Sequence, residues 1–197
     1  MEPPGLQLLA KIQHDQTARL IQLGILQSLS FSEEDFYRKI PLPFPLSDSA
    51  RECGFNRLTL VLPRNLADYT TLFRLGDVTC FPQLEAFVDD SASPSEPYWI
   101  WWQYAPIPDA LDPCMCRYGF PGAERGLTFQ EGLHVALQHP EILTSRPLDC
   151  PGTRYVRAHH IPCIYMHAGH VEVSAICRPV YCRHVIMGGL VARILKD

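Results

Sequence analysis

The chain has 197 residues, of which 47% are hydrophobic and 19% are charged, so it is too apolar for an intrinsically disordered protein. Its 17 lysine and arginine residues and 21 aspartate and glutamate residues leave a net charge of −4, which gives no electrostatic indication of nucleic-acid binding. The 18 prolines predict short elements joined by rigid connections.

No run of apolar residues approaches the ~20 that a membrane-spanning helix needs. The first residues lack the basic start and the unbroken apolar stretch of a secretory signal, and the eight cysteines are irregularly spaced. We therefore expect a cytoplasmic protein with reduced thiols that binds neither membranes nor nucleic acids.

Residues 1–40 predict a helical hairpin. Apolar residues recur at three- and four-residue steps over residues 6–23, and Gly24 follows as a helix stop. Ser32 and the three acidic residues after it predict the start of a second helix that ends near residue 39. We expect this amphipathic hairpin to protrude and to bind a partner protein or a second copy of the chain through Leu9, Ile12, Leu20 and Leu23.

Residues 41–56 predict a proline-rich arm that joins the hairpin to the body, residues 57–197. The arm begins with Pro41-Leu42-Pro43-Phe44-Pro45, which is typical of a stiff, extended spacer. In the body, the apolar composition predicts strands over residues 57–62 and 98–104, the second in a central position. Helical segments are expected over residues 67–75 and 82–88, and Asp89-Asp90 is expected to begin a solvated loop.

Three tryptophans lie close together in the second strand. Alternation along a strand places Trp99 and Trp101 on one face and Trp102 on the other. The run fits either a core strand or a partner-binding surface, and we expect Trp102 to contribute to partner binding.

A helix is predicted over residues 128–138 because Thr128 and Glu131 have the spacing of a capping box. The following His139-Pro140-Glu141 fits a helix end and the start of a new turn. Residues 160–166 and 170–176 predict a β-hairpin with its turn at residues 168–169, and further strands are expected over residues 180–186 and 190–195. Together these elements predict a single α+β domain with a mixed, mainly antiparallel sheet, helices packed on it and an N-terminal helical hairpin.

The firmest sequence motif lies in residues 126–165. It contains Leu-Thr-x-x-Glu-Gly beginning at Leu127, then His-Pro-Glu-x-Leu beginning at His139, and then Pro151-Gly152-Thr153-Arg154 and Ile161-Pro162-Cys163-Ile164-Tyr165. This order resembles an uncharacterised family of bacterial cytosolic proteins, although the family tends to have serine at the position of Thr153. The resemblance implies a fold and a bacterial source, but no reaction.

Cysteine and histidine residues are frequent near the C-terminus. Thiolate and imidazole groups bind zinc when four of them converge, and the candidate set is Cys163, His167, His170 and Cys177. No Cys-x-x-Cys pair is present, and such loose mixtures of residues are more often scattered core thiols and surface imidazoles. A catalytic Cys150, with His159 or His160 as base, is a further alternative, but the neighbouring Asp149 would raise the pKa of its thiol.

The chain contains no glycine-rich phosphate loop and no pair of carboxylates suited to acid–base catalysis. Our leading hypothesis is a non-enzymatic interaction or accessory protein of a bacterial cytosolic complex that needs no cofactor. The alternative is an enzyme that depends on zinc or on a cysteine in the C-terminal Cys/His cluster.

Overall fold

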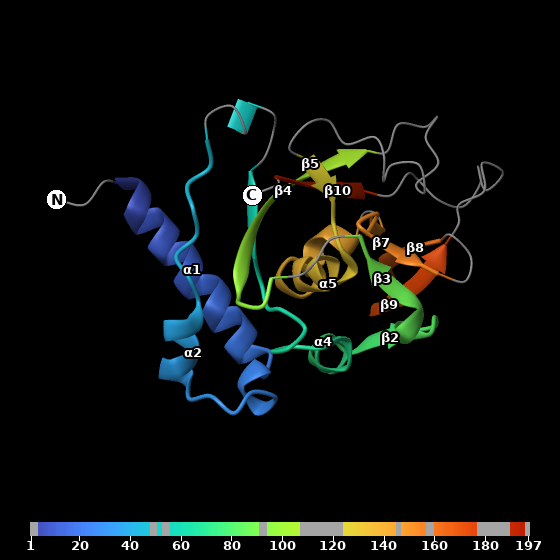
Figure 1. The fold of residues 1–197 in the computed structure, drawn as a ribbon, viewed down its shortest axis with the longest axis horizontal. Coiled ribbons are helices and arrows are strands. Elements are labelled where there is room, and N and C mark those ends of the chain that lie inside the picture. Colours follow the sequence, from blue (N-terminus) through green and yellow to red (C-terminus); the bar gives the residue numbers. More distant parts are fainter. Residues whose placement is uncertain are drawn as a thin grey trace.

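The computed structural model describes residues 4–47, 51–52, 56–90, 94–106, 124–144, 147–156, 160–176 and 190–195. It has an α+β fold in which a curled eight-stranded sheet surrounds helix α5 (Phe129–Gln138) (Figure 1). The structure also describes the helices α1 (Pro4–Gln22), α2 (Glu33–Lys39) and α4 (Tyr69–Gly76) and the short 3-10 turns η1 (Ile25–Gln27), η2 (Leu84–Ala86) and η4 (Pro140–Thr144).

The large sheet has the strand order β1-β4-β10-β6-β8-β9-β2, with β5 also paired to β10. Most neighbours are antiparallel, whereas the pairs β10–β6 and β2–β9 are parallel, which confirms the mixed, mainly antiparallel sheet. A separate antiparallel pair is formed by β3 and β7. The strand bounds are β1 (Arg57–Val61), β2 (Val78–Cys80), β3 (Phe87–Asp89), β4 (Tyr98–Pro106), β5 (Glu124–Gly126), β6 (Leu148–Asp149), β7 (Thr153–Tyr155), β8 (Ile161–His167), β9 (His170–Ile176) and β10 (Leu190–Leu195).

Helix α5 begins where the capping box predicts. Thr128 is its N-cap: the Thr128 hydroxyl accepts a hydrogen bond from the N–H of Glu131, and the Glu131 carboxylate accepts one from the N–H of Thr128. His139 forms the C-cap and Pro140 begins η4, as the sequence indicates. All residues from Phe129 to Leu137 are buried, so α5 is covered on every side and not only on one amphipathic face.

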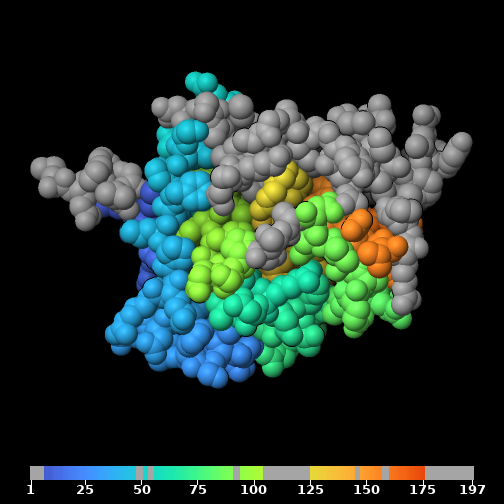
Figure 2. All heavy atoms as spheres, viewed as in Figure 1, coloured from blue at the N-terminus to red at the C-terminus, as the bar shows by residue number. Residues whose placement is uncertain are grey.

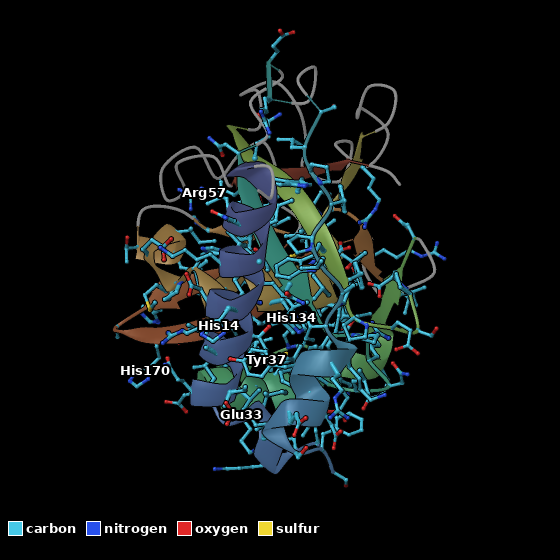
Figure 3. The ribbon with its side chains drawn as sticks, turned by 90° about the vertical axis from the view of Figure 1, so that its left-hand side faces the viewer. His14, Glu33, Tyr37, Arg57, His134 and His170 are labelled. Atoms are coloured by element: carbon cyan, nitrogen blue, oxygen red, sulfur yellow. The ribbon has the colours of Figure 1, made fainter. Side chains whose placement is uncertain are left out.

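The N-terminal hairpin forms as predicted, because Gly24 adopts a positive φ of 91° after α1 and Ser32 caps α2 through the N–H of Asp35. His14 on α1 stacks on Tyr37 on α2 with ring centroids 5.6 Å apart (Figure 3). The hairpin does not have a core of its own. Its side chains Leu20, Ile25, Phe36 and Ile40 belong to the same apolar cluster as the sheet and α5.

The β8–β9 hairpin has the predicted turn, with Ala168 and Gly169 both in the left-handed region at φ 50° and 87°. One predicted element is wrong in part: the segment 82–88 forms only the short turn η2 before it becomes strand β3. The reason is long-range, since Phe87 pairs with Tyr155 of β7. The strand expected over residues 180–186 lies outside the described residues.

Candidate functional site

The side chains predicted to contact a partner lie in, or against, the protein's own core. Leu9, Leu20 and Trp102 are buried, with Leu20 and Trp102 at 0% exposure. Ile12 and Leu23 are half-buried and pack against the same cluster. The expectation that these residues form a docking surface is therefore corrected: the apolar face of α1 is used to cover the sheet.

The three tryptophans divide between the two faces of β4 as expected. Trp102 donates a hydrogen bond from Nε1 to the hydroxyl of Thr59 at 2.8 Å and packs edge-on against His139 at the end of α5. Trp99 and Trp101 lie on the opposite face, where their indole N–H groups donate to carbonyls of the proline-rich arm. Figure 2 shows residues 41–47 of the arm next to the segment 94–103 on this surface.

The described members of the predicted zinc set do not converge. Cys163 is buried in the middle of β8, whereas His167 and His170 are exposed and face each other at the tip of the β8–β9 hairpin. Four residues along a strand separate Cys163 from His167 by about 13 Å. Cys177 lies outside the described residues, and within the described ranges no three His, Cys, Asp or Glu side chains are placed to hold a metal ion.

The two histidines interact with carboxylates instead. The Nδ1 atom of His167 lies 3.2 Å from Oε1 of Glu172, and Nδ1 of His170 lies 3.7 Å from Oδ2 of Asp77. Figure 3 shows His170 at the periphery of the molecule. Glu172 also accepts a hydrogen bond from the Tyr165 hydroxyl, which lowers the pKa of the carboxyl. Burial, followed by this hydrogen bond, raises the pKa of the Tyr165 phenol.

Cys150 has the environment of a core thiol. It is fully buried, and a Cβ on Gly132 of α5 would clash with its sulfur. Burial, with smaller contributions from Cys163 and Asp149, raises the pKa of the Cys150 thiol well above its usual value. A nucleophilic cysteine requires the opposite shift, so the geometry gives no support to a catalytic role for Cys150.

A cluster of charged groups that the sequence did not reveal lies at the start of α5. Arg125 of β5 forms a two-pronged ion pair with the buried carboxylate of Glu131, with N–O distances of 2.8 and 2.5 Å. The hydroxyl of Tyr98 donates to the same carboxylate at 3.2 Å. Because Glu131 also caps Thr128, its two oxygens are fully used in joining β4 and β5 to α5.

Asp89, at the end of β3, forms a second part of the cluster. The sequence predicted a solvated loop residue, but the side chain is only 9% exposed. It accepts a hydrogen bond from Thr153 of β7 and one from Arg64 at 3.1 Å. Burial raises the pKa of Asp89, while Thr153 and Arg64 oppose that rise. Each carboxylate therefore has an arginine and a hydroxyl as partners, an arrangement suited to fixing the strands on α5.

The outer edge of β1 is closed by side chains of two helices. Gln16 of α1 acts like a residue of a neighbouring strand: its Nε2 donates to the carbonyl of Leu58 at 2.5 Å, and its Oε1 accepts from the N–H of Leu60 at 2.7 Å. Successive residues of a strand direct their main-chain groups to opposite sides. In β1 the groups of Arg57, Thr59 and Val61 point toward β4, so those of Leu58 and Leu60 point away from it.

Helix α5 closes the rest of this edge with a polar row that recurs every four residues. Gln138 donates to the carbonyl of Leu60, His134 accepts from the N–H of Leu62, and Gln130 donates to the carbonyl of Leu62, at 2.7, 3.1 and 2.8 Å. Because the main-chain N–H and C=O groups of this edge already have side-chain partners, they are not available to pair with a further strand.

The opposite end of the sheet differs. β2 pairs with β9 on one side, and within the described part of the chain no strand pairs with its other side. Phe81, which directly follows β2, is 66% exposed, although its N–H continues the ladder by donating to the carbonyl of Val173. This free edge and the exposed ring beside it are the features that best fit a partner-binding site.

No helix in the described ranges is both long and apolar enough to cross a membrane. No protein-family model, curated protein sequence or solved structure matches the chain. The functional argument therefore depends on the geometry of this molecule.

Proposed function

We propose that the protein is a non-enzymatic accessory protein of a bacterial cytosolic complex, and that it binds a partner protein at the free edge of β2. The observation that carries this proposal is the difference between the two ends of the large sheet. The β1 edge is closed by glutamine and histidine side chains, whereas within the described residues no strand pairs with the outer side of β2, which ends next to an exposed aromatic ring.

The main chain of β2 defines what would bind. In its parallel pairing with β9, Phe81 directs its N–H toward Val173, so Val78 and Cys80 direct their N–H and C=O groups to the other side. An extended segment of a partner satisfies such groups by adding a strand to the sheet. We therefore predict that the partner protein binds through an extended peptide segment of its own.

Apolar side chains extend the surface beyond the strand. Val88 and Val156 are both exposed and lie on the same outward face of the β3–β7 pair, because Val88 pairs with Arg154 and the N–H of Val156 donates to the carbonyl of Ala86. Figure 2 shows the segments 78–90 and 147–156 side by side at this end of the molecule. A bound strand would have apolar contacts available in addition to main-chain hydrogen bonds.

The test compares Phe81→Asp with Leu8→Asp. Both side chains are strongly exposed, at 66% and 60%, but Leu8 lies on α1 and away from the β2 edge. Partners are captured from a bacterial lysate, identified and purified. For a partner that uses the proposed site, we expect Phe81→Asp to weaken binding by about tenfold or more and Leu8→Asp to leave it within about twofold.

Amide hydrogen exchange on the purified complex locates the contact. Strand addition slows exchange of the Val78 and Cys80 amides, because their hydrogens become bonded to the partner. A complex in which these two amides exchange as in the free protein would show that the partner binds elsewhere and would overturn the proposal.

A further inference from the structure

We infer that the Trp99–Trp101 face of β4 is a binding site for polyproline II segments, occupied in this structure by the chain's own residues 40–46 and open to exchange with a proline-rich segment of a partner protein. Residues 40–46 are called the docked segment below. The inference goes beyond the proposed strand addition, since it concerns a different surface and a different backbone conformation.

The docked segment has the period of a polyproline II helix. Its buried residues are Ile40, Pro43 and Leu46, which are spaced by three, while Leu42 and Phe44 are exposed between them. A polyproline II helix has three residues per turn, so every third side chain lies on one face. The sequence Ile-Pro-Leu-Pro-Phe-Pro-Leu favours this conformation before any contact is made.

The hydrogen bonds repeat with the same period. Trp99 Nε1 donates to the carbonyl of Pro41 at 2.8 Å, and Trp101 Nε1 donates to the carbonyl of Phe44 at 3.0 Å. Gln13 of α1 adds a bond from its Nε2 to the carbonyl of Ile40 at 2.7 Å. Carbonyls of a polyproline II helix have no internal donors, so they are available to such groups on a neighbouring surface.

This combination is the chemistry by which aromatic-lined grooves recognise proline-rich ligands. Such grooves supply aromatic side chains and side-chain donors, and the ligand supplies a preformed backbone that loses little conformational entropy on binding. Here β4 supplies Trp99 and Trp101, and the docked segment is itself the example of a suitable ligand. The expected partner segment therefore carries proline or an aliphatic residue at every third position.

The position of the docked segment favours its replacement by a partner segment that begins at the C-terminal end, near Phe44. The bond between Trp101 and Phe44 is at the surface, whereas the bond between Trp99 and Pro41 is partly buried. Leu42 and Phe44 present apolar side chains to solvent. A competing segment must still overcome the effective concentration of a tethered ligand, which is in the millimolar range for short connections.

The test uses the three indole N–H signals in NMR spectra as reporters. Trp99 and Trp101 report on the docked segment, and Trp102, whose indole bonds to Thr59 on the opposite face, is an internal control. A synthetic peptide with the sequence of residues 40–46 is added to the wild-type protein and to Pro43→Asp, which places a charge at a buried anchor. The control peptide has aspartate at the positions of Pro43 and Leu46.

In Pro43→Asp we expect the Trp99 and Trp101 signals to move and the Trp102 signal to stay. The native peptide should return both signals toward their wild-type positions, whereas the control peptide should not. The native peptide should bind Pro43→Asp with an affinity at least about tenfold higher than it binds the wild-type protein, whose own segment competes with it. If the two signals have moved, Trp102 is unchanged and millimolar native peptide has no effect, the inference is wrong.

Exchange of the indole hydrogens in the wild-type protein gives an answer even if Pro43→Asp fails to fold. Local opening of the docked segment predicts that exchange at Trp99 depends weakly on urea concentration, whereas exchange at Trp102 requires global unfolding and depends on it strongly. Equal urea dependence at the two indoles would mean that the segment leaves β4 only when the whole protein unfolds, and exchange with a partner would be excluded.

Discussion

The Nε2 atom of His134 accepts a hydrogen bond from the main-chain N–H of Leu62 at 3.1 Å, between residues 72 positions apart in the sequence. Its Nδ1 atom lies 2.9 Å from the carbonyl of Gln130, one turn earlier in α5. Both bonds together require the neutral imidazole with its hydrogen on Nδ1, because a ring protonated on both nitrogens has no acceptor for Leu62. Figure 3 shows His134 behind α1 and α2.

This geometry makes stability depend on pH in a defined window. Burial lowers the pKa of His134 from 6.5 to about 4. Above pH 6.5 both folded and unfolded states carry neutral imidazole, and the stabilisation is complete. As the pH falls from 6.5 toward 4, only the unfolded state takes up the proton, so stability is lost, by about 2 kcal/mol between pH 7.5 and 5.

Urea unfolding of the wild-type protein and of His134→Gln at several pH values measures this contribution. The glutamine retains a side-chain acceptor but does not titrate, and other histidines affect both proteins alike. We expect a weaker dependence on pH between 5 and 6.5 in the variant. Parallel curves would mean that His134 is protonated in the folded protein as readily as in a free peptide.

Replacing Gln16 with leucine should destabilise the protein by about 1–3 kcal/mol, because the buried main-chain groups of Leu58 and Leu60 lose their partner. Gln22→Leu is the matched control on the same helix, since Gln22 is exposed, and it should change stability by less than about 0.5 kcal/mol. Chemical denaturation gives both values, and faster amide exchange at Leu60 in Gln16→Leu would locate the effect. Equal destabilisation by the two substitutions would show that Gln16 does not close the β1 edge.

Gly132→Ala should destabilise the protein strongly, because the new methyl group would overlap the sulfur of Cys150. The contact with Ile164 is looser and involves the end of a flexible side chain. Removing the sulfur should therefore rescue the substitution: Gly132→Ala combined with Cys150→Ala should be more stable than the sum of the single changes predicts, by about 1–3 kcal/mol. Additive effects in this double-mutant cycle would place the obstruction elsewhere.

Elements with strong local signals were predictable from the sequence. The capping box between Thr128 and Glu131 marks the start of α5, and alternating residues around Gly169 predict the β8–β9 hairpin. In both cases the residues that decide the structure are only a few positions apart in the sequence. The alternation along β4 likewise separated Trp102 from Trp99 and Trp101.

The remaining features depend on contacts between distant segments. Strands β2, β6 and β7 have only two or three residues, so they carry no periodic pattern and exist because of their neighbours. Gln16 and Asp89 have polar side chains that normally face water, and only the fold brings them to a strand edge and to Arg64. The amphipathic α1 illustrates the same difficulty: its apolar face was correctly predicted, but a sequence does not distinguish a face that binds a partner from one that covers its own sheet.

The place of β10 in the sheet has a consequence for how the protein is made. It lies between β4 and β6, so it joins the half of the sheet that contains β1 to the half that contains β8 and β9. During synthesis the strands of both halves precede residues 190–195, so the two halves remain unjoined in the sheet until β10 emerges. A nascent chain that pauses before this strand would expose two new sheet edges, and we expect it to depend on chaperones or to aggregate.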